Sequence, residues 1–165
     1  MIRPVLIDDA EQIAEIYNYY VTNSIITFEE ETVSADEYVN RITDTISNGF
    51  PWLVWETDGA IAGYAYAGKW RQRIAYRFTV ETAVYLDQGQ LGNGIGSQLY
   101  AALLDELRKG DFRVVMGWVA LPNEESVKLH ERFGFKKVAH FPEVGWKFNR
   151  WIDVGGWQLM LNSDE

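Results

Sequence analysis

The chain has 165 residues, 47% of them hydrophobic and 15% aromatic, which suits one folded domain spanning residues 1–165. Its 24 acidic residues outnumber 15 basic ones, and the formal charge of −9 opposes a broad electrostatic interaction with nucleic acid or an anionic membrane. The absence of cysteine excludes disulfides, thiolate metal sites and a Cys nucleophile. His130 and His140 are the two histidines, and they lack a tight carboxylate cluster, which argues against a catalytic metal. We therefore expect small organic ligands.

The N-terminus becomes acidic within its first ten residues and lacks the apolar core of a signal peptide. No apolar run approaches the roughly 20 residues that cross a bilayer. These patterns predict a cytoplasmic protein that does not associate with membranes.

The first third of the chain predicts one strand and two helices. Residues 2–6 favour a short strand, and Asp8 with Glu11 forms a capping pair for the first helix. The periodicity then breaks before Ser34 and Glu37 repeat the capping signature and open a second helix.

Two further strands are expected at residues 52–57 and 60–70, joined by the strong hairpin signal Asp58-Gly59. A basic segment follows in this acidic chain, consisting of Lys69, Arg71, Arg73 and Arg77. Charge pattern alone favours a solvent-exposed strand end, while a clamp for an acidic substrate is the functional alternative.

Residues 79–97 organise the chain, because a β-branched strand runs through a glycine-rich turn directly into a helix. The first N–H groups of such a helix lack intrahelical partners and attract an anion. Gly92, Gly94 and Gly96 allow left-handed dihedrals and close approach of a phosphate. A pyrophosphate site and a plain tight connection are both open on this pattern. A Walker loop is excluded because no Lys-Ser/Thr follows the glycines, and a Rossmann site because no acidic ribose ligand follows in a βαβ unit.

The rest of the chain completes an alternating pattern. Residues 112–121 predict a strand buried on both faces, residues 123–133 a short helix, and residues 135–141 and 155–161 the last two strands. The resulting order predicts an α/β fold with a mixed sheet of about seven strands covered by about four helices.

With the glycine turn placed between a strand and a helix, the sequence resembles the GCN5-related N-acetyltransferases (GNAT). The second part of the family pattern is matched by Asn123, Ser126, Leu129, His130, Gly134 and Phe135. This resemblance implies the GNAT fold, with a mixed and mostly antiparallel sheet. One departure is Leu91, where the family has Gln or Arg and this chain has Gln90 one step earlier. Backbone donors should therefore carry the phosphate contacts.

Residues 70–86 and 144–159 resemble two blocks of the phosphinothricin and methionine sulfoximine acetyltransferases, and residues 26–34 resemble their early loop. This resemblance implies direct transfer from acetyl-CoA to the α-amino group of a small amino-acid analogue, in a ternary complex and without a metal. Antimetabolite resistance and ordinary amino-acid metabolism both stay open as the physiological role.

Two residues are the catalytic candidates that the resemblance implies. Glu81 lies among apolar and β-branched residues just before the turn, and the family makes it the base that removes the ammonium proton, directly or through water. An ion pair with a nearby arginine is its structural alternative. His130 stands at the family's proton-donor position, and a structural histidine is the equally weighted alternative.

The resemblance also implies the cofactor contacts. Their residues are Val84, Tyr85, Leu86, Gly92, Asn93, Gly94, Ile95, Gly96, Ser97, Asn123 and Arg132. Asn123 can also cap the following helix, and both roles can hold together. Arg132 is either a surface residue or a phosphate ligand.

For the substrate, Arg71, Arg73 and Tyr76 precede Glu81 closely, and a guanidinium can bind a carboxylate or phosphinate bidentately. Weaker candidates are Phe28, Glu30, Lys147 and Trp151. The resemblance further suggests a homodimer, in which Trp146, Trp151 and Trp157 contribute either to the interface or to the core.

Two alternatives to this function stay open. The first is an acetyltransferase for another small amine, an ordinary amino acid or a peptide N-terminus. The second is a non-catalytic acyl-CoA sensor, against which an intact Glu81 beside intact glycines argues.

Overall fold

A computed structural model describes residues 1–162. Within these residues one seven-stranded sheet has the strand order β1-β2-β3-β4-β5-β7-β6. The strands are β1 (Ile2–Pro4), β2 (Trp52–Thr57), β3 (Ala60–Lys69), β4 (Thr79–Leu86), β5 (Val114–Leu121), β6 (Lys136–Lys147) and β7 (Arg150–Met160). The α-helices are α1 (Ala10–Asn23), α2 (Ala35–Ser47), α3 (Ile95–Arg108) and α4 (Glu124–Arg132). All neighbouring strands pair antiparallel except β4 and β5, which confirms the mixed, mostly antiparallel sheet.

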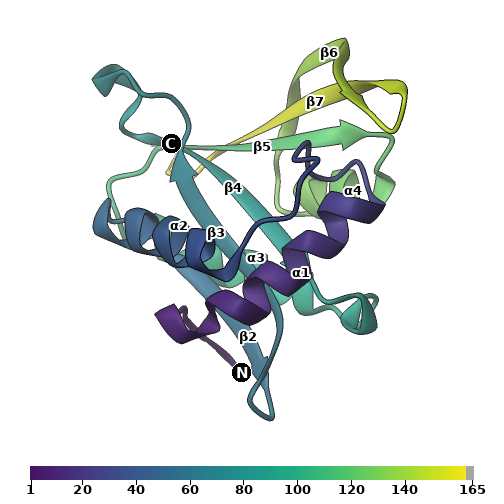
Figure 1. The fold of residues 1–165 in the computed structure, drawn as a ribbon. Coiled ribbons are helices and arrows are strands. Elements are labelled where there is room, and N and C mark those ends of the chain that lie inside the picture. The colour runs from purple at the N-terminus through teal and green to yellow at the C-terminus, as the bar shows by residue number, and fades with distance from the viewer. Residues whose placement is uncertain (163–165) are drawn as a thin grey trace.

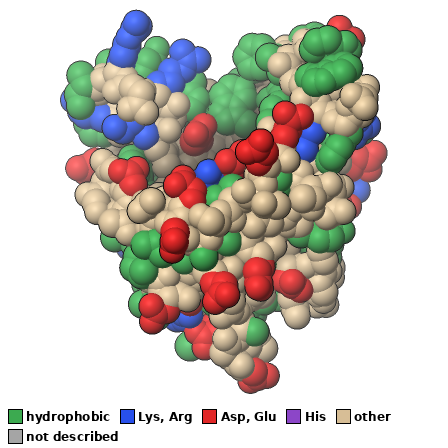
Figure 2. All heavy atoms as spheres, viewed as in Figure 1, with side chains coloured by type: hydrophobic (Ala, Val, Ile, Leu, Met, Phe, Trp, Pro, Cys, Tyr) green, Lys and Arg blue, Asp and Glu red, His purple; other side chains and the backbone are tan. Residues whose placement is uncertain are grey.

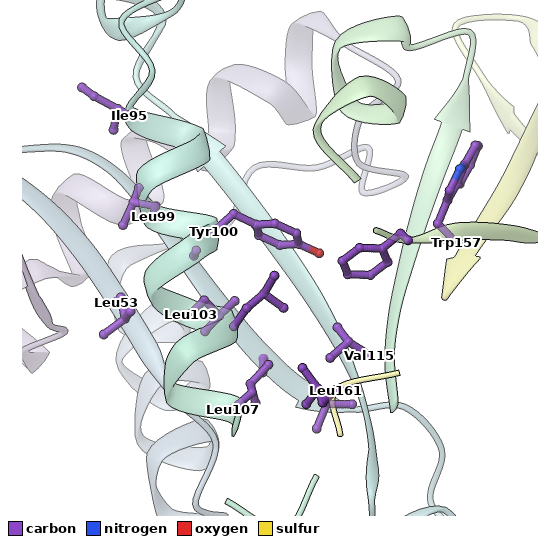
Figure 3. Packing of buried hydrophobic residues seen from close by; sticks show 14 of the residues in the cluster. Leu53, Ile95, Leu99, Tyr100, Leu103, Leu107, Val115, Trp157 and Leu161 are labelled. Carbon is purple, nitrogen blue, oxygen red and sulfur yellow. The ribbon is translucent and has the colours of Figure 1, made fainter. Parts of the chain in front are cut away.

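Helices cover both faces of the sheet (Figure 1). On one face α3 packs on β2, β3 and β4, and its side chains Leu99, Leu103 and Leu107 are fully buried at the i, i+4, i+8 spacing of one helix face. Figure 3 shows these leucines along α3, with Leu99 on the side of Leu53 and Tyr100 directed toward Trp157. Burial of such side chains is the main source of the stability that fixes β4 and β5 in place.

The opposite face is covered by α1 and α2 and is unusually rich in tyrosine. The rings of Tyr17 and Tyr20 pack edge to face on Tyr85 of β4, with centroids 5.2 and 5.4 Å away. Tyr64 of β3 is fully buried in the same cluster, and its hydroxyl lies 3.3 Å from that of Tyr38. Tyrosines let this layer combine apolar burial with hydrogen bonding.

Among the local signals in the first part of the chain, the Ser34 cap and the Asp58-Gly59 turn are confirmed and the Asp8 cap is not. The Ser34 hydroxyl accepts a hydrogen bond from the Glu37 N–H at 3.1 Å, and Asp58 and Gly59 take the left-handed dihedrals of a tight hairpin, as predicted. The pairing of Asp8 with Glu11 is wrong. A short 3-10 turn, Ile7–Asp9, precedes α1, and Asp9 turns back to accept the Leu6 N–H and the Arg3 guanidinium.

The last two strands are longer than the sequence predicts and form a hairpin whose turn is Phe148-Asn149. Both turn residues have positive φ, at 52° and 55°, although neither is glycine. The usual turn signal is therefore absent from the sequence, and a register shift between Phe141 and Gly145 further hides the alternation of β6. No helix in residues 1–162 has the length and apolar character to cross a membrane.

Candidate active site

The site begins where β4 and β5 separate. Their parallel pairing runs from Thr79 with Val114 to Glu81 with Met116 and then stops. The Phe78 carbonyl accepts a hydrogen bond from the Arg113 N–H, so the backbone groups of Phe78 face β5. The backbone groups of every second residue in a strand face the same side. Those of Val84, six residues later, therefore face the gap. The sheet thus presents free backbone donors and acceptors to a ligand inserted between the two strands.

The glycine-rich turn closes one end of this gap. Gly92 and Gly94 have φ of 81° and 75°, and Gly94 directly precedes α3. The first hydrogen bond of α3 joins the Gln98 N–H to the Gly94 carbonyl, so the N–H groups of Ile95, Gly96 and Ser97 have no partner among residues 1–162. These donors lie at the positive end of the helix, where an anion is favoured.

Close packing sets this helix start against β4. A Cβ atom on Gly96 would lie 3.3 Å from Cδ1 of Leu86, so a side chain there would press on the end of β4. The Leu86 carbonyl accepts a 2.6 Å hydrogen bond from the Tyr20 hydroxyl, which ties the same strand end to α1. The turn and the gap therefore form one continuous surface.

Two side chains of α4 and its N-terminus lie beside that surface. Arg132 donates from Nη1 to Oγ of Ser97 at 3.1 Å, which brings a cation to the free N–H groups of α3. Asn123 accepts from the Ser126 N–H at 3.1 Å and caps α4, as expected for its structural role. Leu91 is 52% exposed, so the unusual residue at this position points away from the core.

Glu81 lies at the point where the two strands part. Side chains alternate along β4, and Glu81 shares the α1 and α2 face with Tyr85, while Val80 packs in the α3 core. Burial raises the pKa of its carboxyl, and the neighbouring Trp118 indole opposes that rise. Within residues 1–162 no Lys, Arg or His lies within 4.0 Å of it, so the ion-pair alternative has no support. A half-buried carboxylate without a cation has the properties of a general base.

His130 is buried and tightly packed. Its Nδ1 lies 2.7 Å from the Ser126 carbonyl, which can only accept, so Nδ1 carries the proton and Nε2 does not. Nε2 points at Gly117, where a Cβ atom would lie only 2.3 Å away. Burial lowers the pKa of the imidazole. These contacts favour the structural alternative for His130 over the predicted role as a proton donor.

The predicted basic segment forms an exposed loop between β3 and β4. The Arg71 guanidinium lies 4.5 Å from the Trp70 ring centroid and 5.7 Å from that of Tyr76. Arg73 is exposed and directly precedes the short 3-10 turn Ile74–Tyr76. Figure 2 shows this basic loop on one side of a hollow and the β6-β7 end of the sheet on the other. The cations are therefore at the rim of the hollow.

The 24–34 loop, which joins α1 to α2, carries the remaining substrate candidates. Phe28 packs on the β6-β7 hairpin, where a Cβ atom on Gly145 would lie 2.4 Å from its ring, and Glu30 is exposed. Lys147 is 2% exposed, and its ammonium donates to the Thr27 carbonyl at 2.7 Å. This contact supports a role for Lys147 in holding the loop, and its contact with substrate stays a prediction.

Sequence reasoning missed two side chains of this site. Trp118 lies on β5 two residues beyond Met116, the partner of Glu81, and Tyr66 of β3 opposes Ala83 on the same face as Glu81. The alternation of YAY in β3 marks Tyr66 as facing one side, but it does not say which layer covers that side. Register between distant strands, which the sequence does not encode locally, brings both beside the carboxylate.

The tryptophans divide between core and surface. Trp157 is 2% exposed and packs in the α3 core, with its ring 6.5 Å from that of His130. Trp146 and Trp151 are 50% and 62% exposed, and their ring centroids lie 4.6 Å apart on the β6-β7 hairpin. The residues that the structure describes hold no group of three His, Asp or Glu side chains that could bind a metal.

A sheet that parts beside a carboxylate, with a glycine-rich helix start at the end of the gap, defines an acetyltransferase of the GNAT class. Residues 2–155 match the Acetyltransferase (GNAT) domain family, and the chain belongs to this family of acyltransferases. It is 37% identical over 157 residues to phosphinothricin N-acetyltransferase of Streptomyces viridochromogenes, covering 95% of this chain and 85% of that protein. It is 37% identical over 155 residues to the L-amino acid N-acyltransferase MnaT of Escherichia coli, covering 94% and 90%. The L-methionine sulfoximine/L-methionine sulfone acetyltransferase of Salmonella typhimurium is 36% identical over 155 residues, covering 94% and 91%.

Solved structures support the same conclusion. The yncA protein of Salmonella typhimurium, determined with its cofactor acetyl-CoA, superposes with a TM-score of 0.97 at 34% identity and covers 100% of this chain and 95% of its own. A phosphinothricin acetyltransferase from Sinorhizobium meliloti in complex with acetyl-CoA gives a TM-score of 0.94 at 34% identity, covering 97% and 87%. The unpartnered N–H groups at Ile95, Gly96 and Ser97 and the gap-facing backbone of Val84 fit such a cofactor.

Proposed function

We propose that the protein is an acetyl-CoA-dependent N-acetyltransferase that acetylates the α-amino group of a small amino-acid analogue, such as L-phosphinothricin or L-methionine sulfoximine. The observation that carries this proposal is Glu81, a half-buried carboxylate without a cation at the point where β4 and β5 separate. The names of the relatives supply the substrate type.

The glycine turn and the gap would hold acetyl-CoA. The N–H groups of Gly94, Ile95, Gly96 and Ser97, with the neighbouring Asn93 and Gly92, would bind the pyrophosphate, and Arg132 would add a charge beside them. The backbone of Val84 and its neighbours Tyr85 and Leu86, with Asn123 across the gap, would bind the CoA arm. When bound, acetyl-CoA supplies an acetyl group activated as a thioester.

Glu81 prepares the amine for attack. An α-amino group is mostly an ammonium at neutral pH, and only the neutral amine has a free electron pair. Burial raises the pKa of Glu81 toward the value of a useful base, and the carboxylate takes the ammonium proton directly or through water. Since the chain has no cysteine, direct transfer in a ternary complex is the simplest scheme.

The basic loop orients the substrate. Arg71, held against Trp70 and Tyr76, and the exposed Arg73 can bind the acidic groups of an amino-acid analogue, while Phe28 and Glu30 approach from the 24–34 loop. A bidentate guanidinium suits a carboxylate or a tetrahedral phosphinate. This arrangement selects amines that carry a nearby anion.

A second candidate is an acyltransferase for ordinary L-amino acids. The 37% identity to the L-amino acid N-acyltransferase of Escherichia coli favours it, because this relative is as similar as the phosphinothricin enzyme. Binding of another small amine or of a peptide N-terminus would depend less on the basic loop. A non-catalytic acyl-CoA sensor would have no use for Glu81.

The decisive experiment measures CoA release from acetyl-CoA with a thiol-reactive dye, for which a chain without cysteine gives a clean background. The amines are phosphinothricin, methionine sulfoximine, common L-amino acids and a peptide, tested with wild type and Glu81→Gln. We expect turnover of the two analogues and a loss of about 100- to 10,000-fold in kcat for the variant, since a general base contributes that much. Binding of CoA without release for any amine would leave the sensor as the function.

We also propose that the protein is a cytoplasmic homodimer. The exposed and adjacent Trp146 and Trp151 support a contact surface on the β6-β7 hairpin. Light scattering on wild type and on a Trp146→Ser, Trp151→Ser double variant tests the assembly, and a monomeric wild type would contradict it.

A further inference from the structure

The 24–34 loop is fastened at several points although it has no secondary structure of its own. At its exit, Asn18 of α1 forms two hydrogen bonds with the backbone of Val33, at 2.7 and 2.8 Å. On its other side, Ile25 packs with Ala120 of β5 and Ile152 of β7. The loop therefore connects the α1 side of the sheet to the strands beyond the gap between β4 and β5.

The centre of the loop is held by an ion pair to α2. Arg41 binds Glu29 bidentately, with Nη2 2.7 Å from Oε1 and Nη1 3.1 Å from Oε2. The Tyr17 hydroxyl also donates to Glu29, and it lies 2.6 Å from the hydroxyl of Thr27. The Arg41 guanidinium rests 5.4 Å from the Tyr38 ring centroid, which fixes its direction. Planar, paired hydrogen bonds of this kind specify an orientation better than a single contact.

This ion pair determines where the neighbouring residues point. The side chains of Thr27 and Glu29 both turn toward Tyr17, whereas Phe28 between them packs on Gly145 and Glu30 is exposed. The hydrogen bonds from Arg41 are the largest cause that holds the pKa of Glu29 below its usual range. The pair is thus fully charged at physiological pH.

We propose that Arg41, acting through Glu29, is a positioning residue that holds the 24–34 loop against the substrate site and thereby sets the affinity for the amine. The inference rests on the proposed function, since Phe28 and Glu30 are its substrate contacts. Neither Arg41 nor Glu29 was singled out by the sequence, because their partnership joins a helix to a loop twelve residues away.

The structure offers a matched control in the same arginine. Nε of Arg41 also bonds to Glu37 at 3.1 Å, but Glu37 lies on α2 itself, one helical turn away, and does not touch the loop. Glu37→Gln therefore removes one charge beside Arg41 and leaves both hydrogen bonds to Glu29 in place. Arg41→Lys keeps the charge but removes the paired geometry.

The test combines steady-state kinetics with hydrogen exchange on full-length wild type, Glu29→Gln, Arg41→Gln, Arg41→Lys and Glu37→Gln. For the best amine, we expect KM to rise about tenfold in Glu29→Gln and Arg41→Gln, with the KM for acetyl-CoA unchanged, as for the loss of one network contact. Arg41→Lys should recover part of this loss and Glu37→Gln should resemble wild type. Exchange of the 24–34 amides should increase in the same order.

Other outcomes separate the two proposals. An unchanged amine KM in Arg41→Gln, with wild type active, overturns the positioning role even if stability falls. Equal effects of Glu37→Gln and Glu29→Gln also overturn it, because the loop contact would then be irrelevant. Wild type that releases no CoA with any amine refutes the proposed function itself, and with it the role of Arg41 in amine affinity.

Discussion

The imidazole of His130 fills the space that a side chain on Gly117 would need, with Nε2 only 2.3 Å from the ideal Cβ position. Gly117 lies on β5 and His130 on α4, so this contact sets how closely α4 approaches the strand that borders the gap. The ring centroids of Tyr100 and Phe135 lie 5.4 and 5.1 Å from that of His130, so the imidazole has no space into which it could move.

We expect Gly117→Ala to destabilise the protein by about 1–3 kcal/mol, because overpacking a filled core forces strain on its neighbours. Thermal unfolding should show a Tm lower by about 2–4 °C for each kcal/mol in a chain of this size. The same substitution in a His130→Ala background should cost much less. Equal costs in both backgrounds would show that the histidine does not fill this space.

The half-buried Glu81 predicts a trade-off between stability and activity. Its pKa is raised in the folded protein, so the folded state holds the proton more tightly than the unfolded chain. Above the folded pKa the half-buried carboxylate therefore destabilises the fold. Below the ordinary value of 4.5 both states are protonated and the effect vanishes.

At pH 7 the Glu81→Gln variant should accordingly unfold at a higher temperature than wild type, while losing activity. In a chain of this size, each kcal/mol added to the free energy of unfolding raises Tm by about 2–4 °C. The gain should shrink as pH falls below 4.5, the ordinary pKa of the carboxyl. Calorimetry at pH 7 and pH 4 measures both values. A variant that is less stable than wild type at pH 7 would indicate that the carboxylate has a stabilising partner.

Local patterns predicted those parts of the fold that depend on neighbours in the sequence. The Ser34 cap and the Asp58-Gly59 hairpin are examples, since each needs only a few consecutive residues. The predicted cap at Asp8 does not form, because Arg3 binds Asp9 in a bidentate ion pair and the chain forms a 3-10 turn at this point. That contact comes from an adjacent strand, and propensity does not include it.

The candidate site divides in the same way. Glu81 stands out in the sequence as a charge in an apolar strand, and the glycine turn stands out by composition. Trp118 and Arg41 do not, because each acquires its role only when distant elements pair. Lys147 was a candidate from the sequence, but the sequence does not show that its ammonium is buried against Thr27.

Gly94 of the glycine turn can be compared with Gly49, which has a similar backbone conformation but lies outside the turn. Gly94 has φ of 75° at the start of α3, and Gly49 has φ of 79° after the end of α2. Neither has a heavy atom closer than 3.9 Å to an added Cβ, so substitution by alanine strains both backbones by about 1 kcal/mol without a clash.

Both alanine variants should lose similar stability, but only Gly94→Ala should raise the KM for acetyl-CoA, by about tenfold, because its Cβ and altered backbone disturb the phosphate donors. Kinetics with varied acetyl-CoA, alongside thermal unfolding, separates the two effects. If Gly49→Ala raised this KM to the same extent, the loss would come from general destabilisation and the turn would not be the phosphate site.

The Trp118 indole favours the charged form of Glu81 and so affects the pH dependence of the reaction. Burial raises the pKa of Glu81 above its ordinary value, and the Trp118 side chain lowers it again by favouring the charged form. Trp118→Phe keeps an aromatic ring beside Phe141, whose centroid lies 6.0 Å away, but removes the indole N–H. The pKa of Glu81 should therefore rise further in this variant.

Because the base must be ionised to accept a proton, kcat/KM falls as pH drops through the pKa of Glu81 in the free enzyme. The acid limb of the pH profile should move to higher pH in Trp118→Phe, while the rate at high pH stays near that of wild type. Trp146→Phe, which changes an exposed tryptophan on the β6-β7 hairpin, is the control and should leave the limb in place. A limb that stays fixed or moves to lower pH in Trp118→Phe would mean that the indole does not stabilise the carboxylate, and that burial alone sets the strength of the base.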